Sequence, residues 1–285
     1  MRSWVSRLND EIHPLYSDLP VLLMSPLSGM CDAVSFNAAA VFVSMQTGNT
    51  VFLALGASYL PYGDRKLWLR AIVSLGAFWL GCFLFSKLRY LGAKRKTVLC
   101  LSFFLQAVFI FVSAALGQAN VSPSFHFANL GAMQPEQALT ASRSDLFILL
   151  PLGFLGFQSG GQIVMSRTLQ VNEIPVNVLT SLYCDFLSDP KILARDNVKR
   201  NRRVIAIVSY FGGVIGSGWL QRSSGGVPSV LWIAGGIKFL MGICWLFWAS
   251  KEEKFPEEKF PAEKVLEEKV PEKILQEKPV EKIAQ

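Results

Sequence analysis

The chain has 285 residues, of which 51% are hydrophobic and 17% charged, and its mean hydropathy is +0.36. Soluble domains carry about 25% charged residues, so this composition argues against an ordinary soluble domain. The pI is about 9.2, but the basic residues form no patch interleaved with aromatic residues, and no nucleic-acid partner is expected.

Six stretches are long and apolar enough to cross a bilayer as helices, since about 20 residues span a hydrocarbon core of about 30 Å. The preceding segment, 1–20, contains acidic residues and is predicted to be a cytoplasmic segment without a cleavable signal. We therefore expect an all-α membrane protein with a domain at 21–250. The predicted spans are 21–45, 68–88, 97–117, 146–166, 203–221 and 229–249.

The fifth predicted span contains glycines at positions 212 and 216. Glycines four residues apart lie on one helix face and let a neighbouring backbone approach closely. We therefore expect a close helix contact at Gly212 and Gly216.

The distribution of Lys and Arg between the loops predicts the orientation. One set of alternating segments holds 14 basic residues and the opposite set holds 5. The segments richer in Lys and Arg face the cytoplasm, and with an even number of spans both ends of residues 1–250 lie on that side. Both termini are therefore predicted to be cytoplasmic. The protein is therefore expected to be a multi-pass membrane protein, in a membrane that the sequence does not identify.

Residues 21–60 are almost free of charge, yet one helix of that length would be about 60 Å long, twice the membrane thickness. Glycine and asparagine tolerate non-helical backbone, so the break is predicted at Thr47-Gly48-Asn49. The remainder, 50–60, is too short to cross and is predicted to be a re-entrant or interfacial half-helix.

The second half of the chain repeats features of the first. Ala71-Ile72-Val73-Ser74 recurs at 206–209, Ser28-Gly29 at 159–160 and Thr47 at Thr180, with offsets between 131 and 135. Three spans per unit place the two halves in opposite orientations. We therefore expect a 3+3 inverted repeat with short half-helices, made of residues of about 21–118 and 146–250, which is the plan of many secondary transporters.

The segment 29–36, GMCDAVSF, followed by 41–51, VFVSMQTGNTV, resembles the signature of the YoaK-like membrane family, also described as domain of unknown function 1275. The segment 175–181, PVNVLTS, is similar to the family's second-half motif, with Val176 where the family has threonine. The resemblance covers about residues 20–250. It implies a multi-pass membrane protein and no particular chemistry.

Two ionisable residues lie near the middle of predicted spans, Asp32 in the first and Lys238 in the sixth. A charge at that depth costs at least about 2.5–3.5 kcal/mol, so a partner, a water-filled cavity or neutralisation must offset the cost. One interpretation makes Asp32 a proton or cation site with Lys238 as its counter-charge or as an anion contact. The other is a structural ion pair. In the repeat register Gln106 lies opposite Lys238.

Other polar residues are candidates for the same pathway. Thr47, Gly48 and Asn49, and Thr180 with Ser181, would present free backbone N–H groups at the start of a half-helix, where anions bind, or would form simple turns. Gln158 and Gln162 are four residues apart and share one helix face, for hydrogen bonding between helices or for lining a cavity.

No hydrolase elbow, zinc-protease motif, P-loop or dinucleotide fingerprint is present, so no enzyme, cofactor or metal site is expected. The leading hypothesis is a transporter of a small, anionic or proton-coupled solute. A non-transporting scaffold or accessory subunit is the second hypothesis, and a membrane-embedded enzyme the third. The lipid bilayer is the expected partner, and a homo-oligomer is left open.

The last 35 residues, from Lys251, hold 8 Lys and 10 Glu. Four prolines interrupt helix formation there, and the apolar residues recur every five positions, which gives a helix no apolar face. This tail is predicted to be a solvated, mostly disordered extension, open to a cytoplasmic docking partner.

Overall fold

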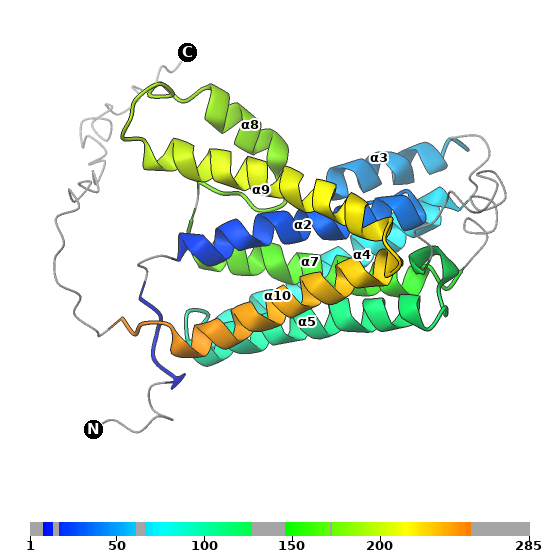
Figure 1. Ribbon diagram of the computed structural model, residues 1–285, viewed down its shortest axis with the longest axis horizontal. Helices are drawn as coiled ribbons and strands as arrows, with labels where there is room; N and C mark the ends of the chain where they lie inside the picture. Colours follow the sequence, from blue (N-terminus) through cyan, green and yellow to red (C-terminus); the bar gives the residue numbers. More distant parts are fainter. Residues whose placement is uncertain (1–7, 14–16, 61–65, 127–145, 172, 252–285) are drawn as a thin grey trace, which may run out of the picture. The chain divides into compact units, whose positions relative to one another are not determined.

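The computed structural model describes residues 8–13, 17–60, 66–126, 146–171 and 173–251. These residues form eight α-helices and two short 3-10 helices, with two isolated bridges and no strand (Figure 1). The tail beyond residue 251 lies outside the described residues. The α-helices are α2 (Asp18–Ala39), α3 (Gln46–Gly56), α4 (Leu67–Ser86), α5 (Lys96–Gln118), α7 (Leu149–Thr168), α8 (Leu179–Leu187), α9 (Val198–Gln221) and α10 (Gly226–Phe247).

Five helices of the described chain are long and apolar enough to cross a membrane: α2, α4 with the 3-10 turn Lys87–Leu91 that continues it, α5, α9 and α10. The fourth predicted span coincides with α7, which has 20 residues but is not among the five. Its polar residues Gln158, Ser159 and Gln162 lower its hydropathy. The described part of the chain is thus all-helical, and its five apolar helices make it a multi-pass integral membrane protein.

Three pairs of helices make the most extensive contacts: α2 with α9, α4 with α7, and α5 with α10. Close approach in the first pair depends on two glycines. A Cβ on Gly29 would lie 2.6 Å from the carbonyl oxygen of Tyr210, and one on Gly213 would lie 2.2 Å from that of Pro26. Only glycine therefore lets these two backbones meet.

The α4–α7 contact uses glycine in the same way. A Cβ on Gly81 would lie 2.1 Å from the carbonyl oxygen of Phe157, and one on Gly160 would lie 2.3 Å from that of Phe78. The expectation of a close contact at Gly212 and Gly216 was wrong, because a Cβ on either would meet nothing within 4 Å. The contact falls on Gly213, which lies about 100° around the helix from Gly212.

Several segments distant in sequence meet at one end of the bundle. Ile12 donates its N–H to the carbonyl of Lys94 at 3.0 Å, and the N–H of His13 donates to Ala249 at 2.8 Å. Lys94, before α5, reaches Gln170, just after α7. At the opposite end, the Trp232 indole donates to Gln118 at 2.8 Å. The N-terminal segment, the start of α5 and the ends of α7 and α10 therefore share one end.

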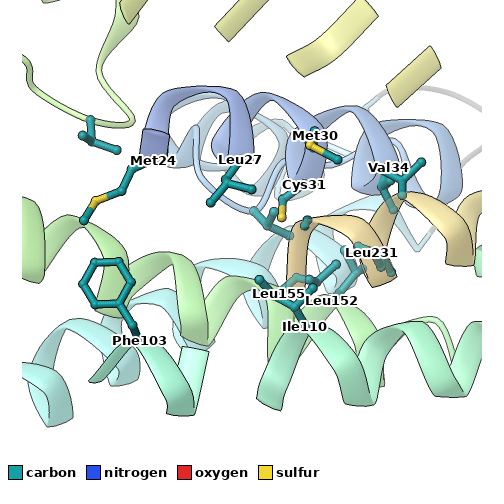
Figure 2. Packing of buried hydrophobic residues seen from close by; sticks show 14 of the residues in the cluster. Met24, Leu27, Met30, Cys31, Val34, Phe103, Ile110, Leu152, Leu155 and Leu231 are labelled. Carbon is teal, nitrogen blue, oxygen red and sulfur yellow. The ribbon is translucent and has the colours of Figure 1, made fainter. Parts of the chain in front are cut away.

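The apolar core lies between α2, α5, α7 and α10. Figure 2 shows Leu27 and Cys31 of α2 directed toward Leu152 and Leu155 of α7, with Leu231 of α10 beside them. All five side chains are at most 1% exposed. Polar side chains buried at the same level are consequently surrounded by hydrocarbon and must find partners within the protein.

Candidate functional site

The chain reverses after α2 earlier than predicted. Helix α2 ends at Ala39, and Ala40 has a left-handed backbone with φ of 57° while its N–H donates to Phe36 at 2.8 Å. The break therefore spans 40–45, and the predicted break at Thr47-Gly48-Asn49 was wrong, since these residues form the first turn of α3. The short helix expected after the first span is confirmed as α3.

The contacts of the Asn49 side chain explain why an asparagine occurs in the first turn of α3. Its side chain is fully buried and pairs with the backbone of one residue: Oδ1 accepts from the Phe42 N–H at 2.9 Å, and Nδ2 donates to the Phe42 carbonyl at 2.6 Å. Ser74 of α4 also donates to that carbonyl, at 2.7 Å. Asn49 thus supplies backbone hydrogen bonds that the non-helical connection lacks.

Asp32 lies on α2, is 2% exposed, and is held by four donors. Its Oδ1 accepts the N–H groups of Val43 and Ser44 at 2.9 and 2.8 Å. Its Oδ2 accepts the Ser44 hydroxyl and the Tyr210 hydroxyl, the latter at 3.2 Å. We call Asp32, Ser44 and Tyr210 the Asp32 cluster; it ties the α2–α3 connection to α2 and α9. The sequence offered no signal for Tyr210, which is 178 positions away.

Lys238 lies at the middle of α10 and is 0% exposed. Its Nζ donates to the Oε1 atoms of Gln158, at 2.9 Å, and Gln162. Both acceptors come from one face of α7, as their spacing predicted. The ion pair considered between Lys238 and Asp32 does not form, because the Asp32 oxygens are directed at the α2–α3 connection and α9.

The hydrogen bonds continue from Lys238 to the start of α8. Gln162 Nε2 donates to the Ser28 hydroxyl at 2.6 Å, and that hydroxyl donates to Oδ1 of Asn177 at 2.7 Å. Asn177 directly precedes Val178, the N-cap of α8, and has a left-handed φ of 74°. We call Lys238, Gln158, Gln162, Ser28 and Asn177 the Lys238 cluster. Sequence reasoning missed Ser28 and Asn177.

Four buried side-chain atoms of the described residues have no hydrogen-bond partner, and two of them belong to amide side chains. One is Nδ2 of Asn177, within the Lys238 cluster. The other is Oε1 of Gln106, a fully buried residue of α5, whose Nε2 donates to Ser102 at 3.1 Å. Since α5 packs along α10, Gln106 and Lys238 belong to paired helices.

The remaining candidates lie at the starts of the two short helices. Thr47 and Thr180 are each the second residue of their helix, α3 and α8, and both are exposed, as is Ser181. The N–H of Gly48 donates to the Met45 carbonyl at 3.3 Å. These residues therefore belong to neither buried cluster.

The chemistry available at the Lys238 cluster is that of one ammonium group surrounded by amides and a hydroxyl. Over the residues that the structure describes, no three His, Cys, Asp or Glu side chains converge as metal ligands. An ammonium group among neutral hydrogen-bonding groups can release and regain its proton, or can bind a small anion.

Comparison with protein families gives a match over most of the chain. The family described as "Protein of unknown function (DUF1275)" matches residues 21–244, which include both clusters and every described helix from α3 to α9. Neither curated proteins nor solved structures gave a match. The chain therefore belongs to the DUF1275 family of proteins of unknown function.

Proposed function

We propose that the protein transports a small solute, anionic or proton-coupled, through a six-span 3+3 inverted repeat with both termini cytoplasmic. The observation that carries this proposal is Lys238, a fully buried lysine at the middle of a candidate span whose hydrogen-bond acceptors are two neutral amides. The proposal gives no residue a catalytic role.

The energetic cost of burying Lys238 supports a site that binds and releases an anion or a proton. A lysine at mid-bilayer depth costs at least about 2.5–3.5 kcal/mol, and amide oxygens offset only part of that cost. An ammonium has three N–H donors, and two go to Gln158 and Gln162. An anion beside Lys238, or release of its proton, removes the remaining imbalance, and each corresponds to a step of anion or proton transport.

The path from Lys238 to α8 supports access from one side. Lys238 donates to Gln162, and hydrogen bonds of 2.6 and 2.7 Å continue from Gln162 through Ser28 to Asn177, directly before the N-cap of α8. Discontinuous helices that end at buried sites are where inverted-repeat transporters bind their solutes. The unpartnered Nδ2 of Asn177 leaves a donor for a solute on this path.

Several features support the inverted repeat. The glycines at the two close helix contacts correspond: Gly29 with Gly160 at an offset of 131, and Gly81 with Gly213 at 132. Thr47 and Thr180 hold the same position in their short helices. A repeat with this register maps α2, α3, α4 and α5 onto α7, α8, α9 and α10. It counts α7 as a span, which brings the total to six.

The test is uptake by proteoliposomes that contain a pH-sensitive dye. Small carboxylates and inorganic phosphate are added in turn, with and without a pH gradient. Lys238→Met should abolish solute-dependent flux or remove its pH dependence. Ile110→Val, a buried change on the paired helix α5 outside both clusters, is the control for altered packing. Flux and pH dependence unchanged in Lys238→Met would exclude Lys238 as the site.

A non-transporting scaffold or accessory subunit is the second candidate, and Asp32 favours it. Its four hydrogen bonds satisfy the carboxylate without any solute. If Lys238 is equally structural, the wild-type protein should show no flux above empty vesicles for any probe, and Lys238→Met should change only the unfolding temperature.

A further inference from the structure

A groove of about 400 Å³ opens between the ends of α4 and α7. Its inner part is apolar, with Phe85 from α4 and Ile163, Val164 and Met165 from α7. Its rim carries two arginines: Arg89, in the turn that continues α4, and Arg167, in the last turn of α7. The eight residues that line it include no acidic side chain.

We propose that this groove binds an anionic phospholipid, with its phosphate between Arg89 and Arg167 and an acyl chain along the partly exposed Ile163 and Val164. Arginine is well suited to the phosphate because its planar fork donates two parallel hydrogen bonds. The apolar inner wall distinguishes the site from a surface that binds a soluble anion, since an acyl chain gains about 0.8 kcal/mol per buried CH₂.

Both arginines are free to accept an anion. Arg89 donates to the Tyr90 hydroxyl at 3.3 Å and lies 5.1 Å from the Tyr90 ring, both neutral partners. Across the described ranges, neither Arg89 nor Arg167 forms an ion pair with a carboxylate. Both side chains are exposed. Two unneutralised cations at one rim complement a single phosphate.

The inner wall is formed by a specific glycine contact. A Cβ on Gly161 would lie 2.8 Å from the Phe85 ring, so glycine at this position lets the ring lie against α7. Phe85 is 3% exposed as a result. The groove is therefore bounded by a well-packed aromatic wall.

The position of the groove agrees with a headgroup depth. Arg167 is followed by Gln170, which bonds Lys94, so the rim lies at the bundle end where 94–96, the N-terminal segment and the end of α10 meet. This is the end that the proposed topology makes cytoplasmic, and anionic lipids are concentrated in the cytoplasmic leaflet. The inference rests on that orientation only for the choice of leaflet.

Native mass spectrometry of the purified full-length protein in detergent tests the proposal. The protein is titrated with phosphatidylglycerol or phosphatidylcholine of the same acyl chains. A preference for phosphatidylglycerol is expected in the wild type. Arg89→Gln with Arg167→Gln should weaken phosphatidylglycerol binding about 25-fold, from about fivefold per basic residue, and leave phosphatidylcholine binding unchanged.

The matched control is Arg195→Gln with Lys199→Gln, which removes the same charge from exposed residues outside the groove. This control should bind as the wild type does. Equal loss in both double variants, or none in Arg89→Gln with Arg167→Gln, would overturn the proposal. So would displacement of the lipid by equimolar glycerol phosphate, which would identify a site for soluble phosphate. Because no transport is measured, the outcome is independent of Lys238.

Discussion

The two buried charges of this protein are stabilised in opposite ways. Asp32 has four donors, two of them backbone N–H groups of the connection that follows its own helix. This arrangement resembles an acidic cap, because a carboxylate satisfies N–H groups that no helix or strand partners. Within the described residues, Lys238 donates to two amide acceptors. We therefore expect Asp32 to have a mainly structural role, while the proposed function rests on Lys238.

We expect Asp32→Ala to destabilise the protein by about 3–5 kcal/mol, because it leaves the buried N–H groups of Val43 and Ser44 without an acceptor. Tyr210→Phe removes only one of the four hydrogen bonds and should cost about 1 kcal/mol. Unfolding of each variant in detergent, followed by tryptophan fluorescence, measures the difference. Equal stability of Asp32→Ala and wild type would contradict the structural role.

At the scale of the elements, glycines decide which helix faces meet. Gly29 and Gly213 lie where α2 and α9 come into backbone contact, whereas Gly212 and Gly216 of the same helix meet nothing within 4 Å. The short helices α3 and α8 follow non-helical connections that asparagine side chains hold by hydrogen bonds. Asn49, in the first turn of α3, pairs with the backbone of Phe42, and Asn177, before α8, accepts from Ser28. Glycines thus set the distances between the packed helices, and asparagine side chains stabilise the non-helical connections before α3 and α8.

Neighbouring glycines of α9 offer a matched pair of substitutions. Gly213→Ala should destabilise by about 1–3 kcal/mol, because its Cβ would lie 2.2 Å from the Pro26 carbonyl oxygen and α9 would have to move. Gly212→Ala should be neutral or stabilise by up to about 1 kcal/mol, through helix propensity. Thermal unfolding in detergent compares them; the same effect from both would contradict the packing.

Asp189, in the loop between α8 and α9, is expected to make the stability of the fold depend on pH in the acid range. Hydrogen bonds from the N–H of Lys191 and from Asn197, with Arg203 nearby, lower the pKa of Asp189 below its usual range. A lowered pKa means that the ionised group stabilises the fold above the unfolded pKa of about 3.9, and that this is lost as pH falls through the folded pKa.

The measurement is the unfolding temperature of wild type and Asp189→Asn between pH 3 and pH 7. The wild type should be the more stable at neutral pH. The difference should begin to shrink as pH drops below the unfolded pKa of about 3.9, and should be lost as pH falls through the lowered pKa of the folded Asp189. A difference that stays constant over the whole range would show that the Asp189 carboxylate contributes no charge-dependent stability to this loop.

At the scale of the whole molecule, the basic residues and the tertiary contacts point to the same arrangement. The segments 11–13, 94–96 and 249–251 hydrogen-bond to one another. Segment 94–96 is one of the segments that carry the 14 basic residues. Segments 11–13 and 249–251 lie at the two ends of the membrane domain, and the charge bias places both ends on the same side as 94–96. A charge bias of 14 against 5 then predicts that this end faces the cytoplasm.

Single cysteines introduced into a cysteine-free variant test this orientation. Lys94→Cys should be labelled by a membrane-impermeant maleimide only in inside-out vesicles, and Arg222→Cys, after α9, only in right-side-out vesicles. Permeant maleimide labels both and serves as the accessibility control. Labelling of both positions from the same side would contradict the predicted topology.

The all-helical membrane class, the approximate spans and the presence of two short helices could be read from the sequence, because hydropathy and helix length are local properties. The same reasoning identified Asp32, Lys238, Gln158 and Gln162, since polar residues are conspicuous in apolar runs. It misplaced the break after α2, because Ala40 adopts a left-handed backbone that alanine rarely adopts.

Only the tertiary structure decided which residues meet. Tyr210 reaches Asp32 over 178 positions, and Lys238 reaches Gln158 over 80, while Asp32 and Lys238 have separate partners. Such pairs depend on the rotation of each helix about its axis, which is set by where glycines let neighbouring backbones touch. The apolar pattern of a membrane helix specifies that rotation weakly, because lipid and protein interior are equally apolar.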